Sequence, residues 1–231
     1  MTRKVNDMKT VLGIWGINAK HSTVSYLITG IFLATSITTF VLHMIGLPVN
    51  GNPMGDCLFL LPICLAVFVP ALNMTKIMNL GGTRMDIFKG FFLTYAGAAV
   101  GASLVSLILY PADSLILVPD QPSLNLWDVF GFLNNGPVVG FFQMAAFFLM
   151  FACVVHTLTL SQGHWYGWVA DVVIVSIISV FTPIPPLRAA LIWFFDLVIF
   201  NPVPIVQILA CLVIGAVVYA ASLIPIKTKA I

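Results

Sequence analysis

The residues of this chain that could act chemically are few and widely separated. Its cysteines and histidines include no pair at a spacing that would chelate a metal, and neither a Walker phosphate loop nor a Gly-x-Ser-x-Gly nucleophile elbow occurs. The cysteines are most simply small core residues: Cys57, Cys64, Cys153 and Cys211. We therefore predict that the chain is not an enzyme and binds no metal, nucleotide or other cofactor directly.

Charges inside the chain gather in one segment, Asn79-Leu-Gly-Gly-Thr-Arg-Met-Asp-Ile-Phe-Lys-Gly90, between two long apolar stretches. A polar hinge in this place is suited to pass force or a signal from a soluble partner to the membrane. Glycines permit a sharp helix end, and the charged side chains can pair with a partner. We predict a coupling segment at 79–90, with these site residues: Gly81, Gly82, Thr83, Arg84, Asp86 and Lys89. The alternative is an ordinary connection with basic residues on the cytoplasmic side.

Asp171 is a second candidate, because it lies about five residues into an apolar stretch. A carboxylate in hydrocarbon costs about 3 kcal/mol unless it faces protein or water. Asp171 could therefore line a translocation path or couple transport to protons. The alternative is that it lies near enough to the interface to stay hydrated, or that it bonds to a neighbouring helix.

Composition places these candidates in a lipid bilayer. The chain is 60% hydrophobic and only 8% charged, with a mean hydropathy of +1.07, whereas soluble domains carry about 25% charged residues. Glutamate is absent, and all eight acidic residues are Asp. We predict an all-α integral membrane protein that forms a single transmembrane domain over 1–231, with membrane lipids and not nucleic acid around it.

Apolar runs of about 20 residues are long enough to cross the hydrocarbon core of a bilayer. Six such spans are predicted: 26–46, 58–78, 91–110, 137–160, 166–182 and 203–224. The stretch 184–201 is bounded by prolines and holds a helical piece of about 13 residues, which is too short to span. We expect a re-entrant or interfacial helix there, on the extracellular side before the last span, which is tolerable at membrane depth only if protein buries it.

Basic residues set the orientation. Nine of the ten Lys and Arg residues fall before the first span, around the second connection or after the last span. The opposite side has Arg188 as its single basic residue, together with most of the aspartates: Asp56, Asp113, Asp120, Asp128 and Asp196. Both termini are therefore expected in the cytoplasm, in a multi-pass protein of the cell membrane.

The N-terminal residues are predicted to be retained and to form an interfacial helix. The first apolar run is too long for a secretory signal and follows more than 20 polar or amphipathic residues. Apolar residues of 5–20 share one helical face, and basic residues lie elsewhere, which suits an amphipathic helix on anionic headgroups. A poorly ordered basic tail is the alternative.

Two weaker patterns concern packing. Gly97-Ala-Ala-Val-Gly101 is a small-xxx-small face that lets helices approach closely. Tryptophans near the predicted interfaces suit membrane anchors: Trp127, Trp165, Trp168 and Trp193.

A family resemblance joins these features. The run Asn73-Met-Thr-Lys-Ile-Met-Asn-Leu-Gly-Gly-Thr-Arg-Met-Asp-Ile-Phe-Lys-Gly90 resembles the cytoplasmic signature of type-2 ABC transporter permeases. The run Val154-Val-His-Thr-Leu-Thr-Leu-Ser-Gln-Gly-His-Trp-Tyr-Gly167 is similar to the second cytoplasmic turn of that family. The re-entrant helix before the last span also fits its layout. The likeness covers most of the chain as architecture, and its Gly-Gly-Thr-Arg motif is short.

The resemblance implies a membrane subunit whose ATPase is a separate cytosolic polypeptide, so that ATP is used by a partner. In that family the N-terminal helix and the second-to-third connection rest on the ATPase; here these are residues 5–20 and 79–90. A second permease, either another copy or a homologous one, completes the transporter. The connection 111–136 is short, so no large extracellular domain is expected, unlike subunits whose ectodomains bind periplasmic partners.

Three functions remain open from the sequence. The favoured one is export of an amphipathic or hydrophobic substrate, such as a peptide, across a bacterial plasma membrane. The second is a non-transporting immunity or scaffold protein with six spans. The third is a proton-coupled secondary carrier that uses Asp171, which is weakened by the lack of a detectable internal repeat.

Overall fold

The computed structural model of the chain describes residues 2–20, 23–46, 55–116 and 125–228. Over these residues the chain is helical and contains no strand. Asp120 and Lys229, whose charges contribute to the predicted orientation, lie outside the described residues. In chain order the elements are α1 (Thr2–Lys20), α2 (Thr23–Met44), the 3-10 helix η1 (Asp56–Phe59), α3 (Leu60–Asn79), α4 (Arg84–Ile116), α5 (Leu126–Phe130), the 3-10 helix η2 (Phe132–Asn135), α6 (Pro137–Ser161), α7 (Trp165–Phe181), α8 (Pro185–Val198), α9 (Pro204–Ala221) and α10 (Leu223–Thr228).

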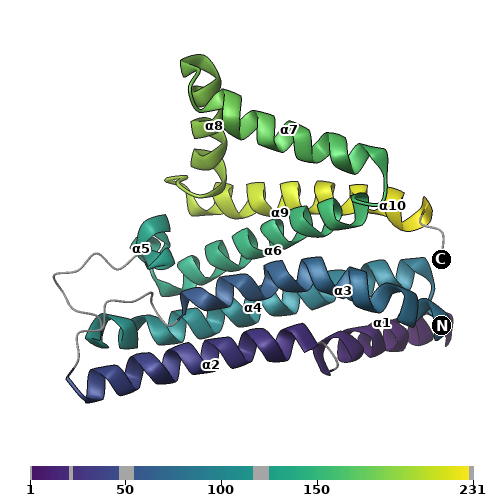
Figure 1. Cartoon of the computed structure of the whole chain (residues 1–231), viewed down its shortest axis with the longest axis horizontal. Coiled ribbons are helices and arrows are strands. Elements are labelled where there is room, and N and C mark those ends of the chain that lie inside the picture. The colour runs from purple at the N-terminus through teal and green to yellow at the C-terminus, as the bar shows by residue number, and fades with distance from the viewer. Residues whose placement is uncertain (1, 21–22, 47–54, 117–124, 229–231) are drawn as a thin grey trace.

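The bundle is organised around α6, which packs against α9, α3 and α4. These helices run lengthwise beside one another in Figure 1. Over the apolar window of each helix, 56% of residues are buried in α6, against 28% in Pro204–Thr228. The drawn N and C ends lie at one end of the bundle (Figure 1). We call it the terminal end, and we call the opposite end, toward which α5 lies, the distal end.

Within the described ranges, four helices are long and apolar enough to cross a membrane: Leu60–Asn79, Arg84–Asp113, Pro137–Ser161 and Pro204–Thr228. The chain is therefore an all-helical protein of membrane type. The helices α7 and α8 pass the same test only as a pair, and they are bent by 115° at the short break between them. In α2 the apolar part, Thr29–Met44, is shorter than this length. Each of the six predicted spans coincides with a helix over most of its length. Crossing by 26–46 and 166–182, the re-entrant nature of 184–201 and the cytoplasmic termini remain predictions.

The N-terminal helix α1 is part of the bundle, because it packs along α4. Ile14 is 3% exposed and lies against Gly90, where an added Cβ would come within 2.5 Å of its Cγ2 atom. Asn18 is fully buried; its Nδ2 donates to Thr94 Oγ1 at 3.1 Å, and its Oδ1 accepts from Asn73 Nδ2 at 2.9 Å. These hydrogen bonds join α1, α3 and α4. The interfacial position of 5–20 remains a prediction, and the second half of this helix has partners in the bundle.

The distal end is more structured than a simple connection over 111–136. Helix α4 continues through Pro111 to Ile116, six residues beyond the predicted end of the third span, and α5 and η2 follow. Trp127, 1% exposed, donates from Nε1 to Ser106 Oγ at 2.8 Å. The ring is therefore buried in the bundle and folds the α5 segment into it, which does not suit a membrane anchor; a position of Trp127 near the interface remains a prediction. The other predicted anchors, Trp165, Trp168 and Trp193, are exposed.

Three aspartates approach one another at this end. Asp56 accepts the main-chain N–H of Leu126 at 3.3 Å to each carboxylate oxygen, which attaches η1 to α5. Burial raises the pKa of Asp56 to about 6; the Leu126 hydrogen bond lowers it, and the charges of Asp113 and Asp128 raise it further. Asp128 also accepts the Tyr110 hydroxyl at 2.8 Å.

The contact between α1 and α4 predicts opposite effects for two glycines of one helix. Gly90→Ala forces a Cβ against the β-branched Ile14 and should lower the free energy of unfolding by about 1–3 kcal/mol. Gly101→Ala meets nothing within 4 Å and should be neutral or should stabilise by up to about 1 kcal/mol. The measurement is unfolding of both variants in mixed micelles. Equal stability of the two would contradict the contact, and Ile14→Ala should rescue Gly90→Ala.

The raised pKa of Asp56 predicts a pH effect on stability. The folded protein holds this proton more tightly than the unfolded chain does, so the contribution of Asp56 falls as the pH rises from about 4 to about 6. Asp56→Asn keeps an acceptor for Leu126 but cannot titrate. Its melting temperature should therefore fall less than that of the wild type between about pH 4 and about pH 6. Asp196→Asn, at an exposed position in α8, is the control. The same pH profile for Asp56→Asn and the wild type would contradict the assignment.

Candidate functional site

The predicted coupling segment begins with a tightly formed helix end. The N–H of Gly81 donates to Met78 O at 2.9 Å, and the N–H of Gly82 donates to Ile77 O at 3.0 Å. These are the two bonds of a Schellman motif after a helix that ends at Asn79. Gly81 has φ +86, and a Cβ on Gly82 would lie 2.7 Å from Ile77 Cγ2. The sharp helix end expected of this glycine pair is therefore present, and each glycine is needed for a different reason.

The second half of the segment is the start of α4, not a loop. Thr83 and Asp86 form a reciprocal cap: Thr83 N donates to Asp86 Oδ2, and Asp86 N donates to Thr83 Oγ1, each at 3.2 Å. The negative carboxylate also lies at the positive end of the helix dipole. The turn itself is thus reduced to residues 80–83. A capping role for Thr83 and Asp86 was not assigned from the sequence, although Thr-x-x-Asp is the pattern that could have indicated it.

Arg84 connects the segment to the C-terminal helix. Its Nη1 donates to the main-chain oxygen of Lys227 in α10. Beyond it, the Thr228 hydroxyl and His164 Nε2 share a hydrogen bond of 3.1 Å, which ties α10 to the turn before α7. Ile226, the residue before Lys227, is completely buried. The two turns at the terminal end are therefore linked through α10.

The outer surface of the segment is partly apolar. Leu80 is 76% exposed and Met85 is 45% exposed, and the exposed Lys76 and Lys89 lie in the adjoining helix turns. The sequence interpretation used the charged residues and passed over Leu80 and Met85. The sequence could have indicated them, because two large apolar side chains occur in a segment that is too polar to lie in hydrocarbon. We call Lys76, Leu80, Met85 and Lys89 the tip surface.

Asp171 is held locally. Gln162 Nε2 donates to its Oδ2 at 2.8 Å, and the side chain is partly exposed. Asp171 lies six residues into α7, about 9 Å along the helix from its first residue. This bond agrees with the alternative that Asp171 bonds to a neighbouring segment. Its proposed place on a translocation path remains a prediction, and the structure does not join it to the coupling segment.

Comparison of the chain with protein-family models, with curated proteins and with solved structures gave no match. The resemblance to ABC permeases therefore depends on the residues quoted above and remains a hypothesis.

The two turns at the terminal end provide a matched test of the Schellman geometry. Gly81→Ala places a Cβ in a left-handed conformation and should destabilise the protein by about 1 kcal/mol. Gly163→Ala lies in the turn before α7, with open space around it and no positive φ, and should change little. Thermal unfolding of both variants checks this. The prediction is wrong if both alanine variants have the melting temperature of the wild type.

Proposed function

We propose that this chain is the membrane permease subunit of an ATP-driven exporter, and that a separate cytosolic ATPase binds its tip surface. The observation that carries the proposal is an exposed, partly apolar turn held rigidly between two long bundle helices. Leu80, at 76% exposed, is the most accessible large apolar side chain of that turn. A lipid-facing role does not suit it, because lysines flank it in both adjoining helices.

Rigidity matters because a flexible turn would absorb the movement of a partner. The Schellman motif and the Thr83–Asp86 cap fix both ends of the turn, and Arg84 fixes it to α10. Helix α4 then runs for 33 residues, about 50 Å. It packs against α1, α3 and α6. A displacement at the tip surface would therefore reach the centre of the bundle through packed helices.

The chemistry of the tip surface indicates what its partner should present. Leu80 and Met85 suit an apolar groove, since buried apolar anchors carry most of the energy of a contact. Lys76 and Lys89 suit an acidic rim around that groove. Asp86 caps α4, and the two lysines outweigh its single negative charge, so the net charge offered to the partner is positive.

The proposed transport cycle is the one that the resemblance to ABC permeases implies. ATP binding and hydrolysis take place on the partner, and closure of two ATPases rocks two permeases between inward-open and outward-open states. The second permease is another copy or a homologous chain. We propose an amphipathic or hydrophobic cargo, such as a peptide, and a bacterial plasma membrane as the location. The apolar helices and the small number of internal charges support such a cargo.

A substitution at the tip surface separates this proposal from the immunity or scaffold alternative. Leu80→Asp should reduce ATPase activity that copurifies with the chain by about tenfold, because a charge replaces an apolar anchor. Leu80→Met retains the apolar side chain and should preserve the activity. Both variants should fold, since the side chain is exposed. The measurement is ATP hydrolysis by affinity-purified protein from its native membrane.

Absence of ATPase activity in the wild-type preparation, or equal activity in both variants, would count against the permease proposal. Leu80 is preferred to Arg84 for this test. Substitution of Arg84 would also break its contact with Lys227, so loss of activity would not distinguish binding from folding.

A further inference from the structure

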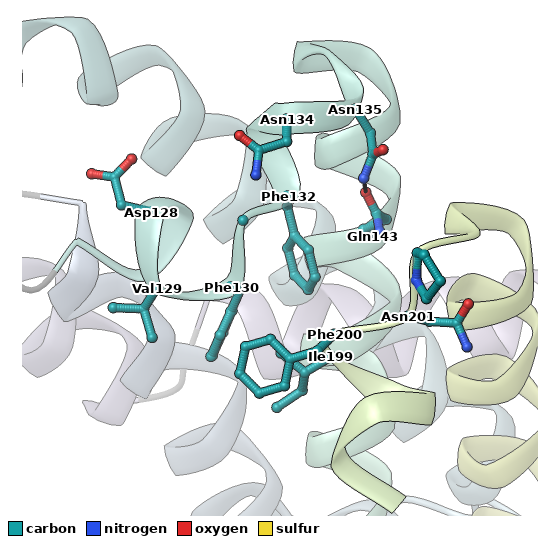
Figure 2. Close-up of a pocket in the computed structure, with 12 residues that line it drawn as sticks. Asp128, Val129, Phe130, Phe132, Asn134, Asn135, Gln143, Ile199, Phe200 and Asn201 are labelled. Atoms are coloured by element: carbon teal, nitrogen blue, oxygen red, sulfur yellow. Dashed lines mark hydrogen bonds between the residues drawn. The ribbon is translucent and has the colours of Figure 1, made fainter. Parts of the chain in front are cut away.

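A pocket opens at the distal end, where α5, η2 and α6 meet the link between α8 and α9. Its volume is about 320 Å³, within the range of about 300–1,000 Å³ that small-molecule sites occupy. One wall comes from α5 and η2, and another comes from the link at 199–202 (Figure 2). The pocket is therefore assembled from parts of the chain that are distant in sequence.

Gln143 is the buried polar group of this pocket. It is 1% exposed, whereas the other polar side chains of the lining are exposed or half-buried. Its Oε1 accepts a hydrogen bond from Asn135 Nδ2 at 3.2 Å, and its Nε2 lies on the other side of the amide (Figure 2). Among the described residues none accepts a hydrogen bond from this nitrogen. Protein does not enclose the nitrogen either, so it is open to the pocket that Gln143 lines.

The unpaired part of Gln143 is therefore a donor. A carboxamide nitrogen carries two N–H groups and no acceptor, and the oxygen of this amide is already used by Asn135. A polar group this deeply placed gains most from a partner that reaches it, because an unpaired buried donor costs about 1–3 kcal/mol. The partner that fits is a hydrogen-bond acceptor.

Phenyl rings supply the rest of the lining. The centroids of Phe130 and Phe132 are 5.4 Å apart, and Phe132 is 1% exposed, so this ring is fixed in place. Phe200 enters from the opposite wall and is 53% exposed, which leaves part of its ring accessible. A ligand that reaches the buried amide would thus also lie against apolar surface.

No charge of the lining faces the buried amide. Asp128 is the one ionisable residue of the lining; its carboxylate points away from the rings and amides in Figure 2 and accepts the Tyr110 hydroxyl at 2.8 Å. No Lys, Arg or His contributes to the described lining. An anion would find no cation to offset its lost hydration, and a cation would meet N–H donors in place of acceptors. The ligand that suits the pocket is neutral.

We propose that this pocket binds a neutral carbonyl compound, namely the oxygen of a ketone, ester or amide that is carried on an apolar group. The carbonyl oxygen accepts from Gln143 Nε2, and the apolar group lies against the rings of Phe132 and Phe200. The glycerol esters of phospholipids and free small molecules share this chemistry. The inference does not depend on the permease proposal, because binding is measured on the purified chain without an ATPase, nucleotide or transport.

The experiment compares three probes built on one skeleton. Acetophenone carries a carbonyl, ethylbenzene carries no acceptor, and α-methylbenzylamine is a cation at pH 7. Each is titrated calorimetrically into the full chain in nanodiscs of diether phosphatidylcholine, which contain no ester carbonyl, and the signal from empty nanodiscs is subtracted. Acetophenone should bind saturably and at least about fivefold more tightly than the other two probes.

A spectroscopic measurement locates the bound carbonyl. The chain is labelled with ¹⁵N-glutamine, and the side-chain amide resonance of Gln143 is identified by its loss in Gln143→Met. Acetophenone should shift this resonance saturably, with the affinity that calorimetry gives.

Paired variants assign the binding to the pocket. Gln143→Met keeps the length of the side chain but removes the donors, and should reduce the affinity for acetophenone to that for ethylbenzene. Gln162→Met makes the same change at an exposed position outside the lining and should leave both affinities unchanged. Phe200→Ala should weaken both probes alike, and Phe40→Ala, equally exposed at 53% in α2, should weaken neither. Because Phe200 is exposed, this pair tests the site even if Gln143→Met does not fold.

A change of lipid separates the two sources of the carbonyl. In nanodiscs of diester phosphatidylcholine, a lipid ester in the pocket should shift the Gln143 resonance before any probe is added and should weaken acetophenone binding. A free compound as the natural ligand predicts the same resonance and the same affinity in both membranes. Either result, together with acetophenone binding in the diether membrane, supports the proposal.

Three outcomes would overturn it. They are the absence of saturable acetophenone binding in the diether membrane, equal affinity for acetophenone and ethylbenzene, and an equal effect of each variant and its control.

Discussion

Helix α6 holds the bundle together by close packing, because neighbouring segments approach its backbone at glycines. A Cβ on Gly140 of α6 would lie 2.8 Å from Phe132 O, and one on Gly215 of α9 would lie 3.2 Å from Met150 Cα in α6. Lipid chains are as apolar as the helices, so association in a bilayer relies on such close packing and on hydrogen bonds between helices. Tyr95 and His156 supply one such bond of 2.8 Å between α4 and α6.

The two ends of the bundle differ in how their segments are attached to the central helices. At the terminal end, Tyr219 of α9 donates to Phe88 O of α4 at 2.6 Å, and α10 continues to the contact with Arg84. The tip surface is consequently part of a connected unit. At the distal end, η2 is held against α6 by its contact at Gly140, which leaves the amide and phenyl side chains of the pocket around a hollow that the chain does not fill. One end thus offers an exposed surface, and the other offers a concave site.

The parts of the fold that follow from local chemistry could be predicted from the sequence. Apolar length indicated the helices, and the Gly81–Gly82 pair indicated the sharp end of α3. Features that depend on side chains from other helices could not be predicted from the sequence. Tryptophan is a residue type typical of interfacial anchors, but the ring N–H of Trp127 donates a hydrogen bond to the buried Ser106, 21 residues away. The predicted third span ends at residue 110, yet α4 continues through Pro111 to Ile116. The burial of Asn18 depends on Asn73 and Thr94 from other helices, which no local pattern reveals.

Site-specific photo-crosslinking can test the proposed contact between an ATPase and the tip surface. A photoreactive residue is placed at position 80 and, as a control, at Val138, which is 68% exposed at the distal end. Native membranes are irradiated, and crosslinked products are probed with a labelled ATP analogue. If an ATPase binds the tip surface, position 80 should yield a product that binds the analogue, and position 138 should yield none. An ATP-binding product from position 138 alone, or from neither position, would contradict the proposed contact.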